Sequence, residues 1–235
     1  MPTHSKKFPA WAFMSLALNG LLFVAVATGL QRHYQWPLPA VNQSAIAARV
    51  ATSAPQPIQP GTRHLLSYQQ WVALLQQEAE VAAAQKPEHL SILLGDSISL
   101  WFPAQLLPPK RTWLNQGISG ETSVGLLERL ALIDRTQPEV IFVLIGINDL
   151  IRGTKDETIL ANQQLIIRYL RQVHPQAKIV MQSILPHGTD KVTWEGRDRL
   201  LAISNSRIQS LNTQIKAITK EEGGVYLDLY PLFAD

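Results

Sequence analysis

Residues 93–99 read LLGDSIS and mark the point where an apolar strand ends in a polar Gly-Asp-Ser turn. A serine at a strand-to-helix turn, here Ser97, has an exposed hydroxyl and a backbone N–H at a helix N-terminus, where negative charge is stabilised. We interpret Asp96 beside it as a turn and helix-cap carboxylate rather than a proton shuttle. Taken alone, this stretch would fit an N-capping serine better than a nucleophile.

Two further polar blocks follow later apolar runs: residues 115–122 read NQGISGET, and residues 146–149 read GIND. A glycine N–H and an asparagine side-chain amide are the kind of donors that stabilise a developing oxyanion. Because the three blocks occur in this order, each after an apolar run, they favour a nucleophilic role for Ser97 over a capping role. We interpret Gly117 and Asp149 as structural residues of these turns.

On these three blocks the chain, from about residue 65 to its last residue, resembles the SGNH (GDSL-type) hydrolases. The Ser-Gly-Glu-Thr segment is similar to the lysophospholipase/thioesterase and platelet-activating-factor acetylhydrolase-like branches. The resemblance implies that Ser97 is the nucleophile and that its own N–H, the N–H of Gly120 and the side chain of Asn148 form the oxyanion hole. It further implies an ester hydrolase that cleaves small acyl esters or lysophospholipid-like substrates through a serine acyl-enzyme.

The catalytic base is the point at which the sequence departs from this family. A serine nucleophile needs a neighbouring base, usually a histidine, and the family's Asp-x-x-His block is not found in the sequence. We therefore expect the hydrolase-like domain, residues 65–235, to be incomplete at its C-terminus and nearly inactive as it stands. His89 and His174 are predicted at the wrong end of the sheet, and His187 at the catalytic edge as a surface-loop residue. The alternative function is a catalytically inactive remnant or a non-catalytic binding module of the same fold.

Apolar and amphipathic segments alternate along the chain, which predicts an α/β domain with three layers and a parallel sheet. The resemblance implies the flavodoxin-like strand order 2-1-3-4-5. Ligands of such sheets bind beyond the carboxyl ends of the strands, where all three polar blocks fall. Strands are expected at residues 90–94, 112–114, 140–145, 177–184 and 225–229. Helices are expected from Ser67 to Pro87, over residues 121–133, after a cap at Asp156, and from Asn205 or Ser206 to Gly223.

The N-terminal part differs from the rest of the chain. Residues 8–30 form an apolar run without a formal charge, long enough to cross a bilayer core of about 30 Å. We expect residues 1–34 to hold one transmembrane anchor, with the catalytic part on the exoplasmic or periplasmic side. A cleaved signal peptide, and hence a secreted protein, is the alternative. Residues 35–64, rich in Pro, Ala, Ser and Gln, are expected to form a linker.

Composition limits the remaining functional classes. The 235 residues carry a net charge of +3, with no cysteine and 46% hydrophobic residues, which suits one sizeable core and excludes a disulfide framework. No basic block supports nucleic-acid binding, and neither metal-ligand spacing nor a Gly-rich phosphate loop is present. The lack of a Gly-rich phosphate loop in the sequence also argues against a flavodoxin-like nucleotide binder. We expect no metal or cofactor, and as partners only an acyl ester substrate and the membrane.

Overall fold

The computed structural model describes residues 66–188 and 196–234. The expected anchor (residues 1–34) and linker (residues 35–64) lie outside this described part. Within it, no helix has both the length and the apolar character needed to cross a membrane.

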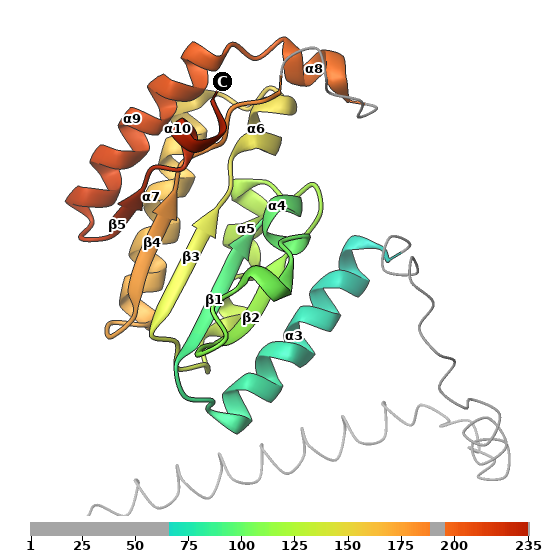
Figure 1. The fold of residues 1–235 in the computed structure, drawn as a ribbon, viewed down its shortest axis with the longest axis vertical. Helices are drawn as coiled ribbons and strands as arrows, with labels where there is room; N and C mark the ends of the chain where they lie inside the picture. Colours follow the sequence, from blue (N-terminus) through green and yellow to red (C-terminus); the bar gives the residue numbers. More distant parts are fainter. Residues whose placement is uncertain (1–65, 189–195, 235) are drawn as a thin grey trace, which may run out of the picture. The chain divides into compact units, whose positions relative to one another are not determined.

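Five parallel strands form one sheet in the order β2-β1-β3-β4-β5 (Figure 1). This is the order that the family resemblance implied. The strands alternate with helices along the chain, as the sequence pattern predicted. The strands are β1 (Leu90–Gly95), β2 (Thr112–Gly117), β3 (Val140–Leu144), β4 (Lys178–Gln182) and β5 (Val225–Leu227).

The helices begin close to the residues that the capping signals indicated. In α3, the side chain of Ser67 accepts from the backbone N–H of Gln70 while the Gln70 side chain accepts from the N–H of Ser67, the expected capping box. The helices and 3₁₀ turns are α3 (Tyr68–Gln85), α4 (Ser97–Leu100), η2 (Ala104–Leu106), α5 (Ser123–Arg129), η3 (Leu130–Ile133), α6 (Ile147–Ile151), α7 (Asp156–Val173), α8 (Arg197–Leu201), α9 (Asn205–Glu221) and α10 (Tyr230–Phe233).

Two helix boundaries differ from the expectation. The helix expected over residues 121–133 is divided into α5, which Thr122 caps through its side chain, and the 3₁₀ turn η3. Asp156 is the first residue of α7 rather than its cap. Its carboxylate instead accepts hydrogen bonds from Arg207 on α9, with Arg207 Nη2 at 2.6 Å and Nε at 3.0 Å. A surface pairing between two helices thus replaces the predicted capping contact.

One face of the sheet carries the main core. Ile92, Ile141 and Ile179 lie side by side in register and are almost completely buried. Because side chains alternate between the two faces of a strand, these residues point together toward α3, α5, α7 and the turn η3, with which they form one hydrophobic cluster. This packing holds the carboxyl ends of β1, β2 and β3 in fixed positions relative to one another.

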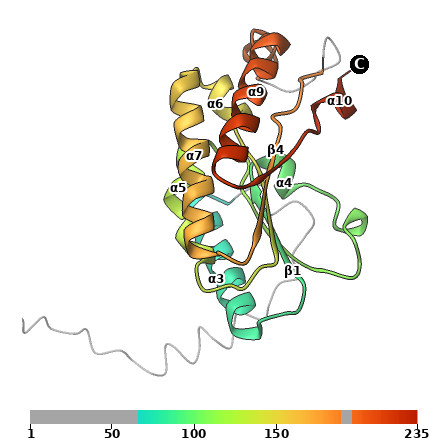
Figure 2. The same cartoon turned by 90° about the vertical axis from the view of Figure 1, so that its left-hand side faces the viewer.

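The opposite face of the sheet differs from the three-layer expectation. Figure 2 shows α5 and the long helices α7 and α9 on one side of the sheet, with the short helices α4 and α10 on the other. Leu93 and Phe142, adjacent in register, line an apolar cavity on that second face. The physical reason is the connection between β1 and β2, which among the described residues contains only α4 and η2 instead of a long covering helix.

Candidate active site

The nucleophile turn is a sharp break at the end of β1. Gly95 has φ +154°, and a Cβ atom there would collide with the backbone oxygen of Leu144 on the neighbouring strand. Only glycine fits so close an approach. Asp96 then acts as the N-cap of α4, and Ser97 is its first residue. The chain therefore turns directly from the strand into Ser97 at the carboxyl edge of the sheet, the position that the sequence predicted.

Asp96 is fully buried, and it has the capping role that the sequence indicated. Its Oδ1 atom accepts a hydrogen bond of 2.9 Å from the N–H of Ile98. Its Oδ2 atom has no hydrogen-bond partner in the described part of the chain. Burial raises the pKa of this carboxyl to about 7, against the lowering effect of the Ile98 hydrogen bond and with a smaller contribution from the charges of Asp149 and Glu121. A neutral acid next to Ser97 is thus accessible near neutral pH.

The second polar block is joined to the nucleophile turn through backbone contacts. The N–H of Ile118 donates to the oxygen of Gly95 at 3.1 Å, and the Asn115 side chain accepts from the N–H of Gly117 at 3.0 Å. A Cβ atom at Gly117 would lie 2.5 Å from the backbone nitrogen of Leu100, so α4 packs directly on this turn. This supports the structural interpretation of Gly117.

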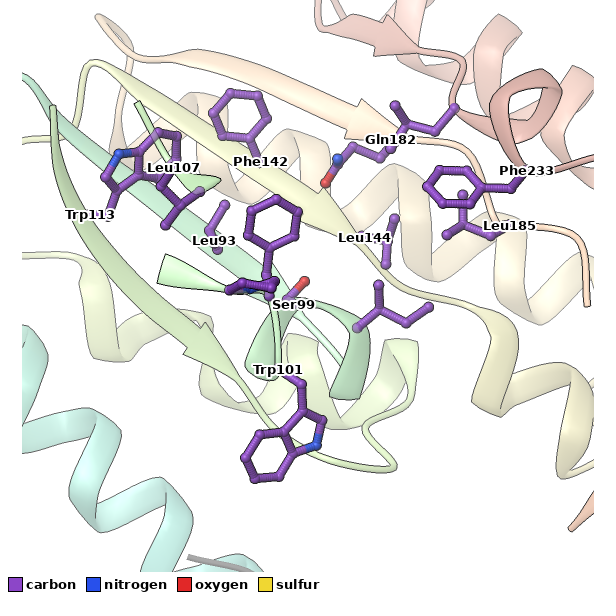
Figure 3. Close-up of a pocket in the computed structure, with 14 residues that line it drawn as sticks. Leu93, Ser99, Trp101, Leu107, Trp113, Phe142, Leu144, Gln182, Leu185 and Phe233 are labelled. Carbon is purple, nitrogen blue, oxygen red and sulfur yellow. The ribbon is translucent and has the colours of Figure 1, made fainter. Parts of the chain in front are cut away.

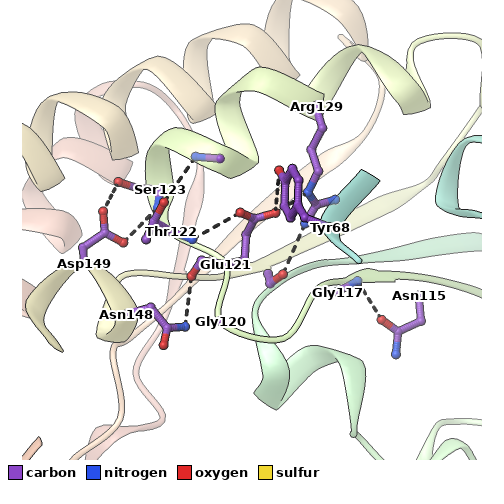
Figure 4. Close-up of polar contacts among 12 residues, drawn as sticks. Tyr68, Asn115, Gly117, Gly120, Glu121, Thr122, Ser123, Arg129, Asn148 and Asp149 are labelled. Carbon is purple, nitrogen blue, oxygen red and sulfur yellow. Dashed lines mark hydrogen bonds and ion pairs between the residues drawn. The ribbon is translucent and has the colours of Figure 1, made fainter. Parts of the chain in front are cut away.

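The third polar block meets the second through Asn148, the second residue of α6 (Figure 4). Its Nδ2 atom donates to the backbone oxygen of Glu121 at 2.9 Å. A primary amide has two N–H groups, so one remains for a ligand. Gly120, which precedes Glu121, has φ +75°, and its oxygen accepts from Arg152 at 2.7 Å. The positions predicted to form the oxyanion hole thus lie on turns that are joined directly to each other.

Asp149 has the structural role that the sequence suggested. Its two carboxylate oxygens accept from the backbone N–H of Ser123 at 2.8 Å and from the Ser123 hydroxyl at 2.6 Å. The Ser123 hydroxyl in turn accepts from Asn162 on α7 at 2.9 Å. Burial raises the pKa of Asp149, with the hydrogen bonds from Ser123 opposing that effect. This network fixes the start of α5 to the third block.

Glu121 and Arg129 form a buried ion pair below these turns (Figure 4). Arg129 Nε lies 2.6 Å from Glu121 Oε2, and each side chain is only 3% exposed. A second guanidinium nitrogen of Arg129 donates to the oxygen of Gly95 at 3.3 Å. Glu121 also accepts from the N–H of Thr122 at 3.3 Å and from the Tyr68 hydroxyl at 3.4 Å. The pair therefore contacts both the first and the second polar block.

The three described histidines lie where the sequence placed them. His89, before β1, contacts Glu139 at 2.8 Å, and His174, after α7, is buried; both lie at the amino end of the strands. At the carboxyl edge, His187 Nε2 lies 2.6 Å from the oxygen of Ile203. The hydroxyl of the proposed nucleophile is that of Ser97, the first residue of α4. None of these histidines is paired with it.

Comparison with known proteins assigns the chain to a family. A model of the GDSL-like lipase/acylhydrolase family matches residues 93–235, more than half of the chain. The chain belongs to this family. The family resemblance inferred from the three polar blocks is thus confirmed.

The matched relatives of this family member include two subunits of platelet-activating factor acetylhydrolase IB. Subunit alpha2 of Gallus gallus is 30% identical over 108 residues, which are 41% of this chain and 44% of that protein. Subunit alpha1 of Bos taurus is 26% identical over 117 residues, which are 46% of this chain and 48% of that protein. The chain therefore spans about half the length of the curated relatives it matches.

A solved structure supports the fold of this GDSL-like chain. The protein from Streptococcus pneumonia, provisionally described as a platelet activating factor, has a TM-score of 0.58 and 24% identity, and the match covers 71% of this chain and 80% of that one. At this identity the likeness concerns the fold. It agrees with the parallel sheet and its helices described above.

Beside the Gly-Asp-Ser turn lies an apolar cavity of about 420 Å³ (Figure 3). Ile98 and Ser99, which follow Ser97, are among its lining residues, as are Leu93 and Phe142 on the open face of the sheet. Its lining is mostly aliphatic and aromatic, a surface suited to apolar groups rather than to charged ones. In the part of the chain that the structure describes, no group of three or more His, Cys, Asp or Glu side chains could hold a metal ion.

Two residues of the site were not singled out by sequence reasoning. Glu121 was interpreted only as part of the second block, and Arg129 only as a helix residue. A signal was present, because Arg129 follows Leu126 by three residues and precedes Ile133 by four, on the apolar side of the expected helix. A charged residue at such a position is buried only when it is paired, and the partner could have been sought among the polar blocks.

Proposed function

We propose that this chain is an ester hydrolase that works through an acyl-enzyme on Ser97. The Ser97 oxygen attacks the ester carbonyl carbon, and its proton passes to a general base. The resulting oxyanion accepts hydrogen bonds from the N–H groups of Ser97 and Gly120 and from the side-chain amide of Asn148. The alcohol then leaves with a proton, and water hydrolyses the acyl-serine to release the acid. The family resemblance gives the base to the histidine of an Asp-x-x-His block, and none of the three described histidines replaces it.

The observation that carries this proposal is the direct linkage of the three polar blocks. The first and second are joined by the 3.1 Å hydrogen bond from Ile118 to Gly95, and the second and third by the 2.9 Å hydrogen bond from Asn148 to Glu121. A structural cap at Ser97 would not require an asparagine amide and a glycine turn to converge on the same edge. An oxyanion hole does require this, since its donors must be fixed before the reaction.

For the substrate, we propose small acyl esters or lysophospholipid-like esters. The relatives named as platelet-activating factor acetylhydrolase subunits support a short acyl group on a lipid-like alcohol. The apolar cavity on the open face of the sheet is not part of this support, because Ser97, Gly120 and Asn148 are not among its lining residues.

The test is covalent labelling and hydrolysis with the chain extended by an Asp-x-x-His block, because none of the three described histidines is placed to act as the base. Wild-type protein, Ser97→Ala and Ser210→Ala are incubated with a fluorophosphonate probe and with p-nitrophenyl acetate. Ser210 lies exposed on α9, so its variant is a matched control for serine removal. We expect label and hydrolysis to be lost only in Ser97→Ala. Labelling that persists in Ser97→Ala would overturn the assignment, and a folded wild-type chain with neither activity would fit the non-catalytic binding module instead.

For the location, we propose that residues 8–30 hold the protein in a membrane, with the catalytic part on the exoplasmic or periplasmic side. The apolar run in the sequence supports this. The full chain should stay with the membrane fraction after alkaline carbonate washing, whereas a chain lacking residues 1–64 should be released. Recovery of a soluble native protein with a new N-terminus near residue 27 would instead identify a cleaved signal peptide.

A further inference from the structure

We infer that Arg129 is a positioning residue, which with Glu121 holds the nucleophile turn and the oxyanion turn in a fixed relative position. This inference rests on the proposed function of the same site. It concerns how the three polar blocks keep their geometry, not which groups touch the substrate.

The contacts of Arg129 span two polar blocks with one side chain. Its Nε atom binds the carboxylate of Glu121 at 2.6 Å, and a terminal nitrogen binds the oxygen of Gly95 at 3.3 Å. Gly95 lies two residues before Ser97, and Glu121 directly follows Gly120. The guanidinium therefore connects the backbone beside the proposed nucleophile with the backbone beside the proposed oxyanion donor.

Glu121 extends this connection to the third block. While its carboxylate binds Arg129, its backbone oxygen accepts the 2.9 Å hydrogen bond from Asn148. A displacement of Glu121 would thus move the contact that orients the Asn148 amide. Oxyanion donors act over a narrow range of distances, about 2.7–3.1 Å. A small misplacement can therefore lower the rate markedly while substrate binding changes little.

Arginine suits this role better than lysine. The guanidinium is planar and presents several N–H donors in a rigid fork, so it can bind a carboxylate and a carbonyl at the same time with fixed geometry. A lysine ammonium is a single point of charge on a flexible chain. In Arg129→Lys the charge remains to pair with Glu121, but the simultaneous contact with Gly95 is lost or lengthened.

A purely structural role is the competing explanation, because a buried ion pair is costly to break whether or not it serves a reaction. Both side chains are 3% exposed, so stability alone cannot separate the two roles. The two roles are separated by measuring kcat and KM independently, together with the rate of serine labelling and the amide exchange of the two turns.

The experiment compares wild type, Arg129→Lys and Arg129→Met, each as the full chain extended by an Asp-x-x-His block so that a catalytic base is present. The matched control is Arg207→Lys. Arg207 also binds a carboxylate, that of Asp156, and a backbone carbonyl, that of Thr154, but it lies on α9. We measure kcat and KM for p-nitrophenyl acetate, the second-order rate constant of fluorophosphonate labelling, the melting temperature, and hydrogen–deuterium exchange.

In Arg129→Lys we expect kcat and the labelling rate constant to fall about tenfold or more, with KM within about twofold of wild type. Amide exchange should become faster at Ile118, whose N–H donates to Gly95, and remain unchanged in α7. Arg129→Met should show a larger effect and a lower melting temperature, since it leaves Glu121 unpaired. Arg207→Lys should leave kcat and the exchange at Ile118 unchanged.

Two outcomes overturn the inference. An Arg129→Lys protein with wild-type kcat, labelling rate and exchange at Ile118, whatever its melting temperature, assigns the pair to stability alone. Equal losses in Arg129→Lys and Arg207→Lys would show a general effect of arginine replacement. If the wild type itself neither hydrolyses nor labels, the proposed function fails, and the exchange at Ile118 still decides whether Arg129 couples the two turns.

Discussion

The Nδ2 atom of Asn148 lies 2.9 Å from the backbone oxygen of Glu121, and this hydrogen bond joins the third polar block to the second. The contact orients the Asn148 amide group and uses one of its two N–H groups. It also places Asn148 beside Gly120, the residue before Glu121. The relationship between these residues gives the proposed oxyanion hole its most specific geometric support.

Replacement of Asn148 by alanine should lower kcat for p-nitrophenyl acetate by about 10²–10³, the usual loss for one oxyanion donor. The value of KM should change little, because the donor acts on the charge that develops in the transition state. Steady-state kinetics of the purified chain extended by an Asp-x-x-His block provide the measurement.

Asn212→Ala is the control for loss of a buried asparagine. Asn212 bonds both the N–H and the oxygen of Ile184 at 2.8 Å, so its loss should reduce the melting temperature without a comparable fall in kcat. An Asn148→Ala protein with wild-type kcat would contradict the role in the oxyanion hole.

Asp96 should make stability depend on pH. Burial raises its pKa from 3.8 to about 7, so between these values the native state binds more protons than the unfolded state. The free energy of unfolding should therefore decrease as the pH rises from about 4 to about 7, by on the order of a few kcal/mol. Asp96→Asn keeps the cap on Ile98 but cannot ionise. Its melting temperature should exceed that of wild type at pH 8, and the difference should vanish near pH 4.

Glu128→Gln serves as the control for Asp96→Asn, since it removes an exposed carboxyl on α5. Its melting profile should follow that of wild type from pH 4 to 8. If Asp96→Asn also follows wild type across this range, the carboxyl of Asp96 is not held neutral by its surroundings.

Gly117→Ala should perturb the site through the backbone. The added Cβ would lie 2.5 Å from the nitrogen of Leu100, so α4 must shift, at a cost of about 1–3 kcal/mol. The labelling rate of Ser97 should fall together with the melting temperature. Gly223→Ala, which strains a residue at φ +71° in the turn between α9 and β5, should reduce stability without slowing the labelling. Equal labelling rates in the two variants would show that α4 tolerates the shift.

His187→Ala should leave the hydrolysis rate of the 235-residue chain unchanged within about twofold. Its Nε2 atom lies 2.6 Å from the oxygen of Ile203, and its ring is not paired with Ser97. The assay is the rate with p-nitrophenyl acetate, measured at several pH values in both proteins. A loss of a hundredfold or more would identify His187 as a substitute base, against the present interpretation.

Local sequence patterns predicted the fold and the position of the site. They did not predict the contacts between residues that lie far apart in the sequence. Uniformly apolar runs such as β3 indicate central parallel strands, and each polar block lies at the carboxyl end of its strand. Residues 97, 120 and 148 could thus be placed at one edge of the sheet from these patterns. The alternation of strands and helices predicted helical layers on the sheet, but it does not tell which face each helix covers, so the short helices on the second face were not foreseen.

The Arg129–Glu121 pair shows the same limit at the site. Each residue has an ordinary local interpretation, a helix residue and a motif residue, and their pairing depends on how α5 packs below the turns. The burial of Asp96 was missed for a similar reason, because its exposure is decided by residues far away in the sequence. Neither contact could be inferred from spacing alone.

The order of the strands has a consequence for synthesis. Each strand after β1 pairs with a strand that precedes it in the chain: β2 and β3 with β1, β4 with β3, and β5 with β4. A ribosome that delivers the chain from its N-terminus therefore supplies every strand after its partner, and no strand must be inserted between two others. The three polar blocks follow β1, β2 and β3, so they can meet while β4 and β5 are still being translated.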